Sequence, residues 1–320
     1  MSKLKICHVG HGVIEIPPKG WGAVESVISS YQWWCEYYGH EFYIVNTQDS
    51  SDCMRAIEDI APDILHIHCE RHFHLASKVR AKMLILCSHW PKLYAPESAT
   101  QAVRMLSGGS HIACLSDSIR EHLLKIGLDP SRLLLARNGA RCEGYRFSRL
   151  PKYSDRSIYL ASIQSRKRQY LFQDIEWLDF VGPRVDMRFD FSRPNYIGEW
   201  TRSQVHSQLT DYANLVLLSK SEAAPLVTCE ALASGLGVVV SVAAAANLDC
   251  SKRFVTVIPE ERLLDTDFVR GAIRENQEIS ITMREEIRRY ARDTFDWRHL
   301  VAKYLEYCES TLNNAGARFA

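Results

Sequence analysis

The sequence lacks the features that mark several large classes of protein. Its 39 Lys and Arg almost balance its 38 Asp and Glu, so no net charge attracts nucleic acid over a long range. No apolar run approaches the ~18 residues that a transmembrane helix needs. The ten cysteines are scattered without a C-x-x-C pair, and the first residues do not have the pattern of a signal peptide. We therefore expect a cytoplasmic protein with reduced thiols, no nucleic-acid partner and no transmembrane segment.

The sequence also has little that indicates a nicotinamide cofactor or a metal ion. No G-x-G-x-x-G follows the first apolar run at residues 3–10, which disfavours a nicotinamide dehydrogenase. The single D-x-D, Asp265-Thr266-Asp267, precedes an apolar helical run and is better explained as a helix N-cap than as a metal ligand. His66 and His68 share one face of an expected strand, with His72 and His74 nearby, but no Cys or carboxylate completes a closed tetrahedral set at a recognisable spacing. We expect neither a metal nor a cofactor.

The sequence instead contains short apolar runs that alternate with helical patterns, as in α/β proteins. With 320 residues it can form two domains, each with its own core. The strands expected in the first half are residues 3–10, 39–46, 62–68, 83–87, 111–116 and 132–136, and those in the second half are 158–163, 177–182, 214–218 and 237–242. A last helix from Trp297 to Leu312 carries an apolar stripe.

The helix expected at residues 24–38 is rich in aromatic side chains. These are Trp33, Trp34, Tyr37 and Tyr38. A helix lying on a membrane surface would place them among lipids, but such helices usually have a basic polar face, and this one carries Glu25 and Glu36 and no Lys or Arg. We therefore expect the aromatic side chains to pack in the core.

The strongest functional signal lies at residues 214–242. An apolar strand is followed by a loop with Glu222, a short helix at about 225–233 that includes Glu230, and a second strand. Pro225 suits the first helical position, and Gly235 suits the residue after the helix end. In such a unit the loop faces the ligand crevice, and the helix N-terminus offers N–H groups to a phosphate.

Glu222, seven intervening residues and Glu230, with the tail Ala231-Leu232-Ala233-Ser234-Gly235, resemble the E-x7-E signature of family 4 retaining glycosyltransferases (glycosyl transferases group 1). The resemblance implies the GT-B fold, in which two Rossmann-like domains present parallel sheets across a cleft. It also implies that Glu230 binds the donor ribose and that Glu222 lies beside the transferred sugar. The alternative is a charge at a helix N-terminus and a solvated helix face.

Other segments resemble the same family. Gly20-Trp21-Gly22-Ala23 resembles its glycine-rich loop, with Ala23 where a second glycine is common. His89 resembles the strand-end histidine near the transferring sugar, and Tyr196-Ile197-Gly198-Glu199 the segment that packs on the nucleotide base. Arg137-Asn138-Gly139-Ala140 resembles the Asn-Gly turn at the exit of the first domain.

The cations expected near the leaving diphosphate show one departure. Relatives have an Arg at a strand end and a Lys several residues later; Lys167 matches the Lys, but Ser162 stands where the Arg is expected. Arg166 and Arg168 flank Lys167. Because neighbouring side chains diverge in a loop, we expect Arg166 to join Lys167 and Arg168 to face solvent.

The resemblance therefore implies two sets of site residues. The catalytic residues are His89, Arg166, Lys167 and Glu222, and the donor-binding residues are Gly22, Ile197, Ala224, Leu226, Val227 and Glu230. The expected domains are residues 1–148 on the acceptor side, residues 149–290 on the nucleotide-sugar donor side, and residues 291–320 as a helix that returns to the first domain.

The implied function is retaining, metal-independent transfer of a hexosyl unit from a UDP- or GDP-linked sugar to a hydroxyl of a glycan or other acceptor. A lipid-linked acceptor would place the protein at the periphery of a membrane. Two alternatives stay open. One is a catalytically silent GT-B subunit that binds a sugar nucleotide or a partner transferase, motivated by Ser162 and Ala23. The other is a UDP-N-acetylglucosamine epimerase.

Overall fold

The computed structural model describes residues 3–89 and 109–317 and divides into two compact units. Unit 1 comprises the chain up to Arg137 together with the chain from Trp297 onward, and unit 2 comprises Asn138–Asp296. We expected residues 138–148 to end the first domain, but they pack within unit 2. The backbone N–H of Ala140 donates to the Phe295 carbonyl (2.8 Å), and that of Arg146 donates to the His206 carbonyl (2.9 Å).

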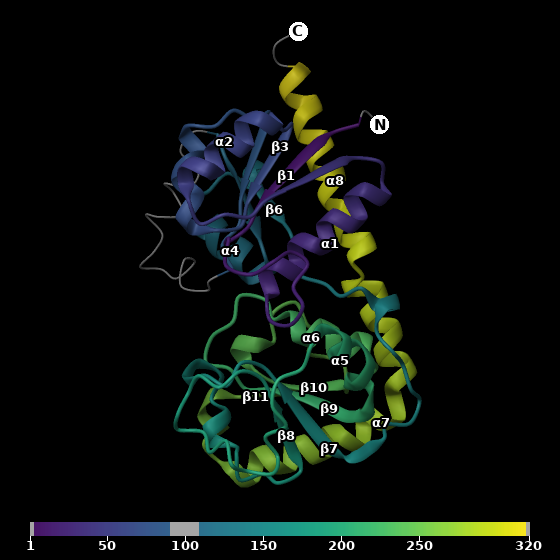
Figure 1. Cartoon of the computed structure of the whole chain (residues 1–320). Helices are drawn as coiled ribbons and strands as arrows, with labels where there is room; N and C mark the ends of the chain where they lie inside the picture. Colours follow the sequence, from purple (N-terminus) through teal and green to yellow (C-terminus); the bar gives the residue numbers. More distant parts are fainter. Residues whose placement is uncertain (1–2, 90–108, 318–320) are drawn as a thin grey trace. The chain divides into compact units, whose positions relative to one another are not determined.

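Unit 1 contains a parallel sheet of six strands in the order β2-β1-β3-β4-β5-β6. The strands are β1 (Lys5–Val9), β2 (Glu41–Val45), β3 (Ile64–Ile67), β4 (Met83–Leu86), β5 (His111–Cys114) and β6 (Leu133–Leu135). Its helices are α1 (Ala23–Tyr37), α2 (Ser50–Ile60), α4 (Asp117–Lys125) and α8 (Trp297–Ala317). Helix α8 lies beside α1, so the last helix packs on unit 1 (Figure 1). Residues 291–296, which we expected to belong to this helix, lie in unit 2 instead, because α7 continues to Phe295.

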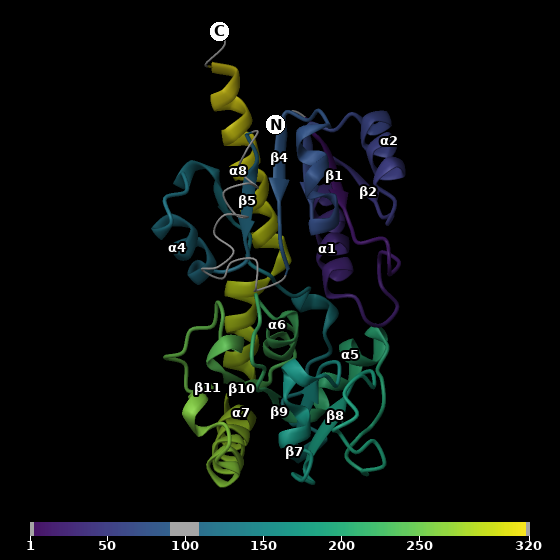
Figure 2. The ribbon, with the colours of Figure 1, turned by 90° about the vertical axis from the view of Figure 1, so that its left-hand side faces the viewer.

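Unit 2 contains a parallel sheet of five strands in the order β11-β10-β9-β7-β8 (Figure 2). The strands are β7 (Tyr153–Leu160), β8 (Leu178–Val181), β9 (Tyr212–Leu217), β10 (Gly237–Ser241) and β11 (Val255–Ile258). The helices are α5 (Arg202–Gln208), α6 (Leu226–Ala233) and α7 (Thr266–Phe295), and α7 contacts β7, β9, β10 and β11. Asp265 caps α7 by accepting from the Phe268 N–H (3.0 Å), which confirms the predicted N-cap.

The chain order reverses at one place in each sheet. In unit 1 the reversal falls between β1 and β3, and in unit 2 it falls between β7 and β9. Doubly wound parallel sheets bind ligands beyond the carboxyl ends of the strands at such points. The predicted α/β fold with two Rossmann-like parallel sheets is therefore confirmed, and the topology marks one candidate binding region in each unit.

The aromatic side chains of α1 divide between core and surface. Trp34 is buried, but Trp33 is 53% exposed and Tyr37 is 60% exposed, so the expectation that all four pack in the core was wrong. The reason is position on the helix, because the buried face of α1 follows Val27, Tyr31 and Trp34 at helical spacing and leaves Trp33 on the other side. Within the described ranges, no helix is both long and apolar enough to cross a bilayer.

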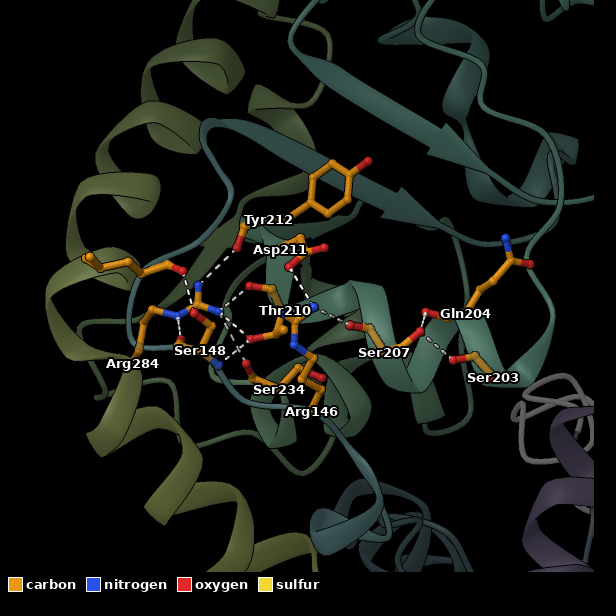
Figure 3. A network of polar contacts seen from close by, with 11 residues as sticks. Arg146, Ser148, Ser203, Gln204, Ser207, Thr210, Asp211, Tyr212, Ser234 and Arg284 are labelled. Carbon is orange, nitrogen blue, oxygen red and sulfur yellow. Dashed lines mark hydrogen bonds and ion pairs between the residues drawn. The ribbon is translucent and has the colours of Figure 1, made fainter.

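A buried arginine anchors the elements that carry the candidate site of unit 2 (Figure 3). The Arg284 guanidinium, from α7, donates to the carbonyls of Ser148 (2.7 Å), Tyr212 (3.0 Å) and Thr210 (2.6 Å), and more weakly to that of Ser234 (3.4 Å). Burial lowers the pKa of Arg284 to about 10. These contacts tie α7 to the start of β9 and to the end of α6.

The ten cysteines form no disulfide. Nine are buried and Cys250 is exposed. This agrees with the expected reduced thiols, most of which serve as small apolar core residues.

Candidate functional site

Two loops meet beyond the carboxyl ends of β7 and β9 in unit 2. The Tyr159 hydroxyl, from β7, donates to the Lys167 carbonyl and accepts from the Leu218 N–H (2.8 Å). The Lys220 N–H donates to the Arg166 carbonyl (2.8 Å). These bonds join the short 3-10 helix Ser165–Lys167 to the loop that carries Glu222. Both loops therefore hold their side chains in fixed positions relative to one another.

Glu222 is the centre of a charged set at this junction. Its carboxylate accepts from the Lys167 ammonium and lies 3.0 Å from Nη1 of Arg166. Lys167 and Glu222 are largely buried, whereas Arg166 is about one-third exposed. Burial alone would raise the pKa of Glu222, but Lys167 and then Arg166 outweigh it and hold the pKa below its usual value. The structure thus brings together three of the four expected catalytic residues, as one anion between two cations.

Arg168 points away from this set. Its backbone is left-handed (φ 59°), which turns its side chain toward Glu260, and the two side chains form an ion pair. The expectation that Arg168 faces solvent was wrong, because its side chain is only 11% exposed. The divergence from Arg166 itself agrees with the prediction that neighbouring side chains separate in this loop.

The N-terminus of α6 lies next to the same loop. Leu226 and Val227 are its first residues, and Pro225 at the N-cap provides no side-chain hydrogen bond to their N–H groups. The preceding Ala224 is held by its carbonyl, which accepts from Nδ2 of Asn138 (2.7 Å). A helix that begins without a side-chain cap offers N–H donors and positive potential to an anion.

Glu230 faces an arginine that the sequence did not point to. Arg202, at the start of α5, donates to the Glu230 carboxylate (2.7 Å) and to the Tyr145 hydroxyl (3.0 Å), and lies 3.3 Å from Nε2 of His206. Glu230 raises the pKa of Arg202, and burial followed by Glu230 raises that of Tyr145. Glu230 is buried, so the alternative of a solvated helix face was wrong.

Ile197 lies beside β8, next to the bridge between Phe180 and Tyr196. Its N–H donates to the Phe180 carbonyl (3.0 Å), which holds the backbone against the strand, while its side chain is 43% exposed. The exposed side chain leaves Ile197 accessible to a ligand at this edge of unit 2.

In unit 1, Gly22 is the N-cap of α1, as its position in the sequence predicted. Its φ of 135° is rarely adopted by other residues, and an added Cβ would lie 2.9 Å from Pro18 and 3.0 Å from Oε2 of Glu25. The carboxylate of Glu25, in the first turn of α1, therefore already lies at this helix N-terminus.

His89 ends a chain of imidazoles that starts at His8 within β1 and runs to the ends of β3 and β4. Its Nε2 lies 3.0 Å from Nδ1 of His68, and Nε2 of His68 lies 3.0 Å from Nδ1 of His8. Burial, followed by His11, lowers the pKa of His89 to about 3. His89 is therefore a neutral imidazole at physiological pH. His66 stacks on His68 (4.0 Å between ring centroids). The other two histidines considered as metal ligands form different hydrogen bonds: His72 with the Thr47 carbonyl and His74 with the Arg71 carbonyl.

Four residues of these two clusters were not predicted from the sequence: Arg202, Tyr145, His206 and His8. A signal existed for Arg202, because Thr201 and Gln204 form a capping box that marks the start of α5. No sequence motif links Tyr145 or His206 to Glu230. His8 lies in an apolar strand whose pattern indicates only a buried core position.

No family model matches the sequence, and no curated protein matches it at the level of sequence. Several solved structures match the fold. AviGT4, a glycosyltransferase involved in avilamycin A biosynthesis, superposes with a TM-score of 0.71 at 16% identity, covering 97% of this chain and 98% of its own. HepE from Anabaena, in complex with UDP and glucose, has a TM-score of 0.71 at 12% identity, with coverages of 96% and 100%. Sucrose-phosphate synthase from Thermosynechococcus elongatus has a TM-score of 0.78 at 11% identity, with coverages of 98% and 100%. The chain therefore has the GT-B fold of these glycosyltransferase structures.

Proposed function

We propose that this protein is a retaining, metal-independent glycosyltransferase that moves a hexosyl unit from a UDP- or GDP-linked sugar to a hydroxyl of a glycan or other acceptor. The observation that carries the proposal is the Arg166, Lys167 and Glu222 set beside the uncapped start of α6, at the point where the order of the unit 2 sheet reverses. Two cations and free helix N–H groups are suited to a diphosphate.

The mechanism follows from what these side chains can donate. When a diphosphate binds, Lys167 and Arg166 can share their donors between it and Glu222, and the N–H groups of Leu226 and Val227 add further contacts. The bond from the anomeric carbon to the leaving phosphate oxygen breaks as the acceptor oxygen attacks the same face. The leaving oxygen takes the acceptor proton. Stabilising the growing charge on the diphosphate lowers the barrier.

The remaining site residues fit binding roles. Glu230, held by Arg202, accepts hydrogen bonds from the ribose hydroxyls, and Ile197 packs on the base. Glu222 fixes sugar hydroxyls. Neutral His89 exchanges hydrogen bonds with the sugar but is too weak a base to hold a proton at neutral pH. In this proposal unit 1 binds the acceptor and unit 2 binds the donor, in a cytoplasmic protein that acts at a membrane surface if its acceptor is lipid-linked.

The donor is tested first with UDP-glucose, because the similar HepE was solved with UDP and with UDP-glucose. A panel of UDP- and GDP-sugars is screened by thermal shift, and transfer and donor hydrolysis are then measured in the presence of EDTA. Glu222→Ala and Lys167→Ala should each remove most of the activity, while Lys252→Ala, which changes a lysine outside the site, should not. Unchanged transfer by the first two variants would exclude the proposed site.

A catalytically silent subunit is the second candidate. Ser162 removes an expected cation, and Arg202 already occupies the Glu230 carboxylate. Stabilisation by a nucleotide sugar without turnover across a broad acceptor screen would favour this function. An epimerase would convert UDP-N-acetylglucosamine without any acceptor, which product analysis distinguishes.

A further inference from the structure

Beyond β3 and β4 of unit 1, a thiol and two imidazoles converge on one point. Nε2 of His89 lies 3.0 Å from Nδ1 of His68 and 3.6 Å from Sγ of Cys87. The ligand atoms of these three residues all lie within 4.8 Å of one another. His68 and Cys87 are buried and His89 is half-buried, so the group reaches toward solvent at His89.

The spacing matches a tetrahedral metal site. Zinc bonds of about 2.3 Å to sulfur and about 2.0 Å to nitrogen separate S and N ligands by about 3.6 Å and two N ligands by about 3.3 Å. Sγ of Cys87 lies 3.6 Å from Nε2 of His89, and the two nitrogens of His68 and His89 need to separate by only a few tenths of an ångström. Sγ of Cys87 and the ligand nitrogen of His68 lie within 4.8 Å of one another. One thiolate with two imidazoles is a donor set that suits Zn²⁺.

We propose that His68, Cys87 and His89 bind a thiophilic divalent metal ion of the Zn²⁺ class. With Nε2 on the metal, His89 keeps only its Nδ1–H for the sugar contact proposed above. The inference rests on the geometry of the three ligands and not on the proposed sugar transfer. On binding, the Cys87 S–H bond breaks, a sulfur to metal bond forms, and the proton passes to solvent. His68 keeps one proton on Nε2 and binds the metal through Nδ1. Three protein ligands leave a fourth position for water.

The surroundings supply the outer contacts that such a site needs. With its proton on Nε2, His68 donates to Nδ1 of His8, which lies 3.0 Å away and fixes the orientation of the ring. The Glu70 carboxylate accepts from the hydroxyl of Ser88, which stands between Cys87 and His89 in the chain. It offsets the positive charge that remains when one thiolate binds a dication.

A second set lies deeper, with ligand atoms of His8, His66 and His68 also within 4.8 Å of one another. Both ring nitrogens of His66 are buried without a hydrogen-bond partner. This set has no anionic ligand, and a dication held by neutral groups in the core carries a large desolvation cost. The outer set is therefore favoured. The two sets can be distinguished by mutation, because only the outer set needs Cys87 and only the deeper set needs His66.

The test uses the full chain stripped of metal and titrated with Co²⁺ and then Zn²⁺. We expect one ion per chain, with a thiolate-to-cobalt charge-transfer band and the visible bands of four-coordinate cobalt. Cys87→Ser should abolish the charge-transfer band and lower Zn²⁺ affinity at least ~100-fold, since loss of outer contacts alone costs 10–100-fold. His66→Phe and Cys114→Ser should leave both unchanged.

X-ray absorption of the zinc-loaded wild type needs no variant, so its result does not depend on whether Cys87→Ser folds. It should give one sulfur at about 2.3 Å with nitrogen or oxygen at about 2.0 Å. Zn²⁺ should also raise the melting temperature of the wild type but not of Cys87→Ser. The proposal is overturned by absence of one-to-one binding, by a metal shell without sulfur, or by binding that His66→Phe removes and Cys87→Ser retains.

Discussion

The Lys167 ammonium donates to the Glu222 carboxylate across 55 residues of sequence. The pair lies where the loops after β7 and β9 are joined through Tyr159, and both members are largely buried. Buried opposite charges remain ionised when they are paired, and breaking such a pair leaves an expensive isolated charge. In the function that we propose, the two side chains exchange partners with the diphosphate of the donor.

Arg166 is expected to contribute to turnover, and Arg168 is not. Arg166 lies 3.0 Å from Glu222, whereas Arg168 pairs with Glu260. Arg166→Ala should lower kcat/KM by roughly 10²–10³, the usual effect of one lost transition-state contact. Arg168→Ala is the matched control and should change little. Steady-state kinetics measure kcat/KM for each variant. An unchanged kcat/KM in Arg166→Ala, together with an increased kcat/KM in Ser162→Arg, would contradict the prediction and would place the missing cation at position 162.

Glu230→Gln should weaken nucleotide binding. Hydrogen bonds to a charged group contribute about 1.5–3 kcal/mol, so Kd for UDP should rise roughly 10- to 150-fold. Glu260→Gln changes a carboxylate that pairs with Arg168 and serves as the control. Isothermal titration calorimetry measures both, and an unchanged Kd in Glu230→Gln would remove the ribose contact from the proposal.

Arg284→Met should destabilise unit 2 by about 3 kcal/mol, because the carbonyls that Arg284 satisfies are left without a donor in the interior. Chemical denaturation followed by circular dichroism gives the change. Arg289→Met, on the exposed side of the same helix, should alter stability by less than about 0.5 kcal/mol. Equal effects of the two substitutions would show that the network in Figure 3 is not an anchor.

Unit 1 should lose stability on acidification. Burial holds the pKa of His8, His66 and His68 well below 6.5 and that of His89 at about 3. Their folded pKa values lie below the unfolded ones, so the unfolded chain takes up protons first. The stabilisation is present above pH 6.5 and is lost as the pH falls toward 3.

The contribution of His66 can be separated from that of its neighbours. His66→Phe keeps a stacked ring but removes one titrating group and two nitrogens that lack partners. In metal-free buffer it should reduce the pH slope of the unfolding free energy by about 1.4 kcal/mol per pH unit well below pH 6.5. An unchanged slope would mean that His66 is already accessible to protons in the folded chain.

The sequence predicted most strands because parallel strands buried on both faces are continuous apolar runs, as in Asn214–Leu218. It also predicted that Glu222 and the cation loop belong to one site, through the resemblance to a known signature. It did not predict β11, a strand of four residues whose Thr256 interrupts the apolar pattern. The partners of Glu230 and of His89 depend on which strands and helices become neighbours. Spacing in the sequence carries no record of that, and so Arg202 and Cys87 emerged only from the fold.

The most direct measurement is calorimetric titration of UDP-glucose, or of the best ligand from the thermal-shift panel, into the wild type, Lys167→Met and Lys167→Met combined with Glu222→Gln. The double substitution leaves no isolated buried carboxylate, so it separates lost diphosphate binding from lost folding. We predict that the wild type binds and that both variants bind at least ~10-fold more weakly, since a charge-assisted contact is lost. Lys252→Met should bind like the wild type. Binding of the same strength in wild type and double variant would contradict the assignment of Lys167 and Glu222 to a nucleotide-sugar site.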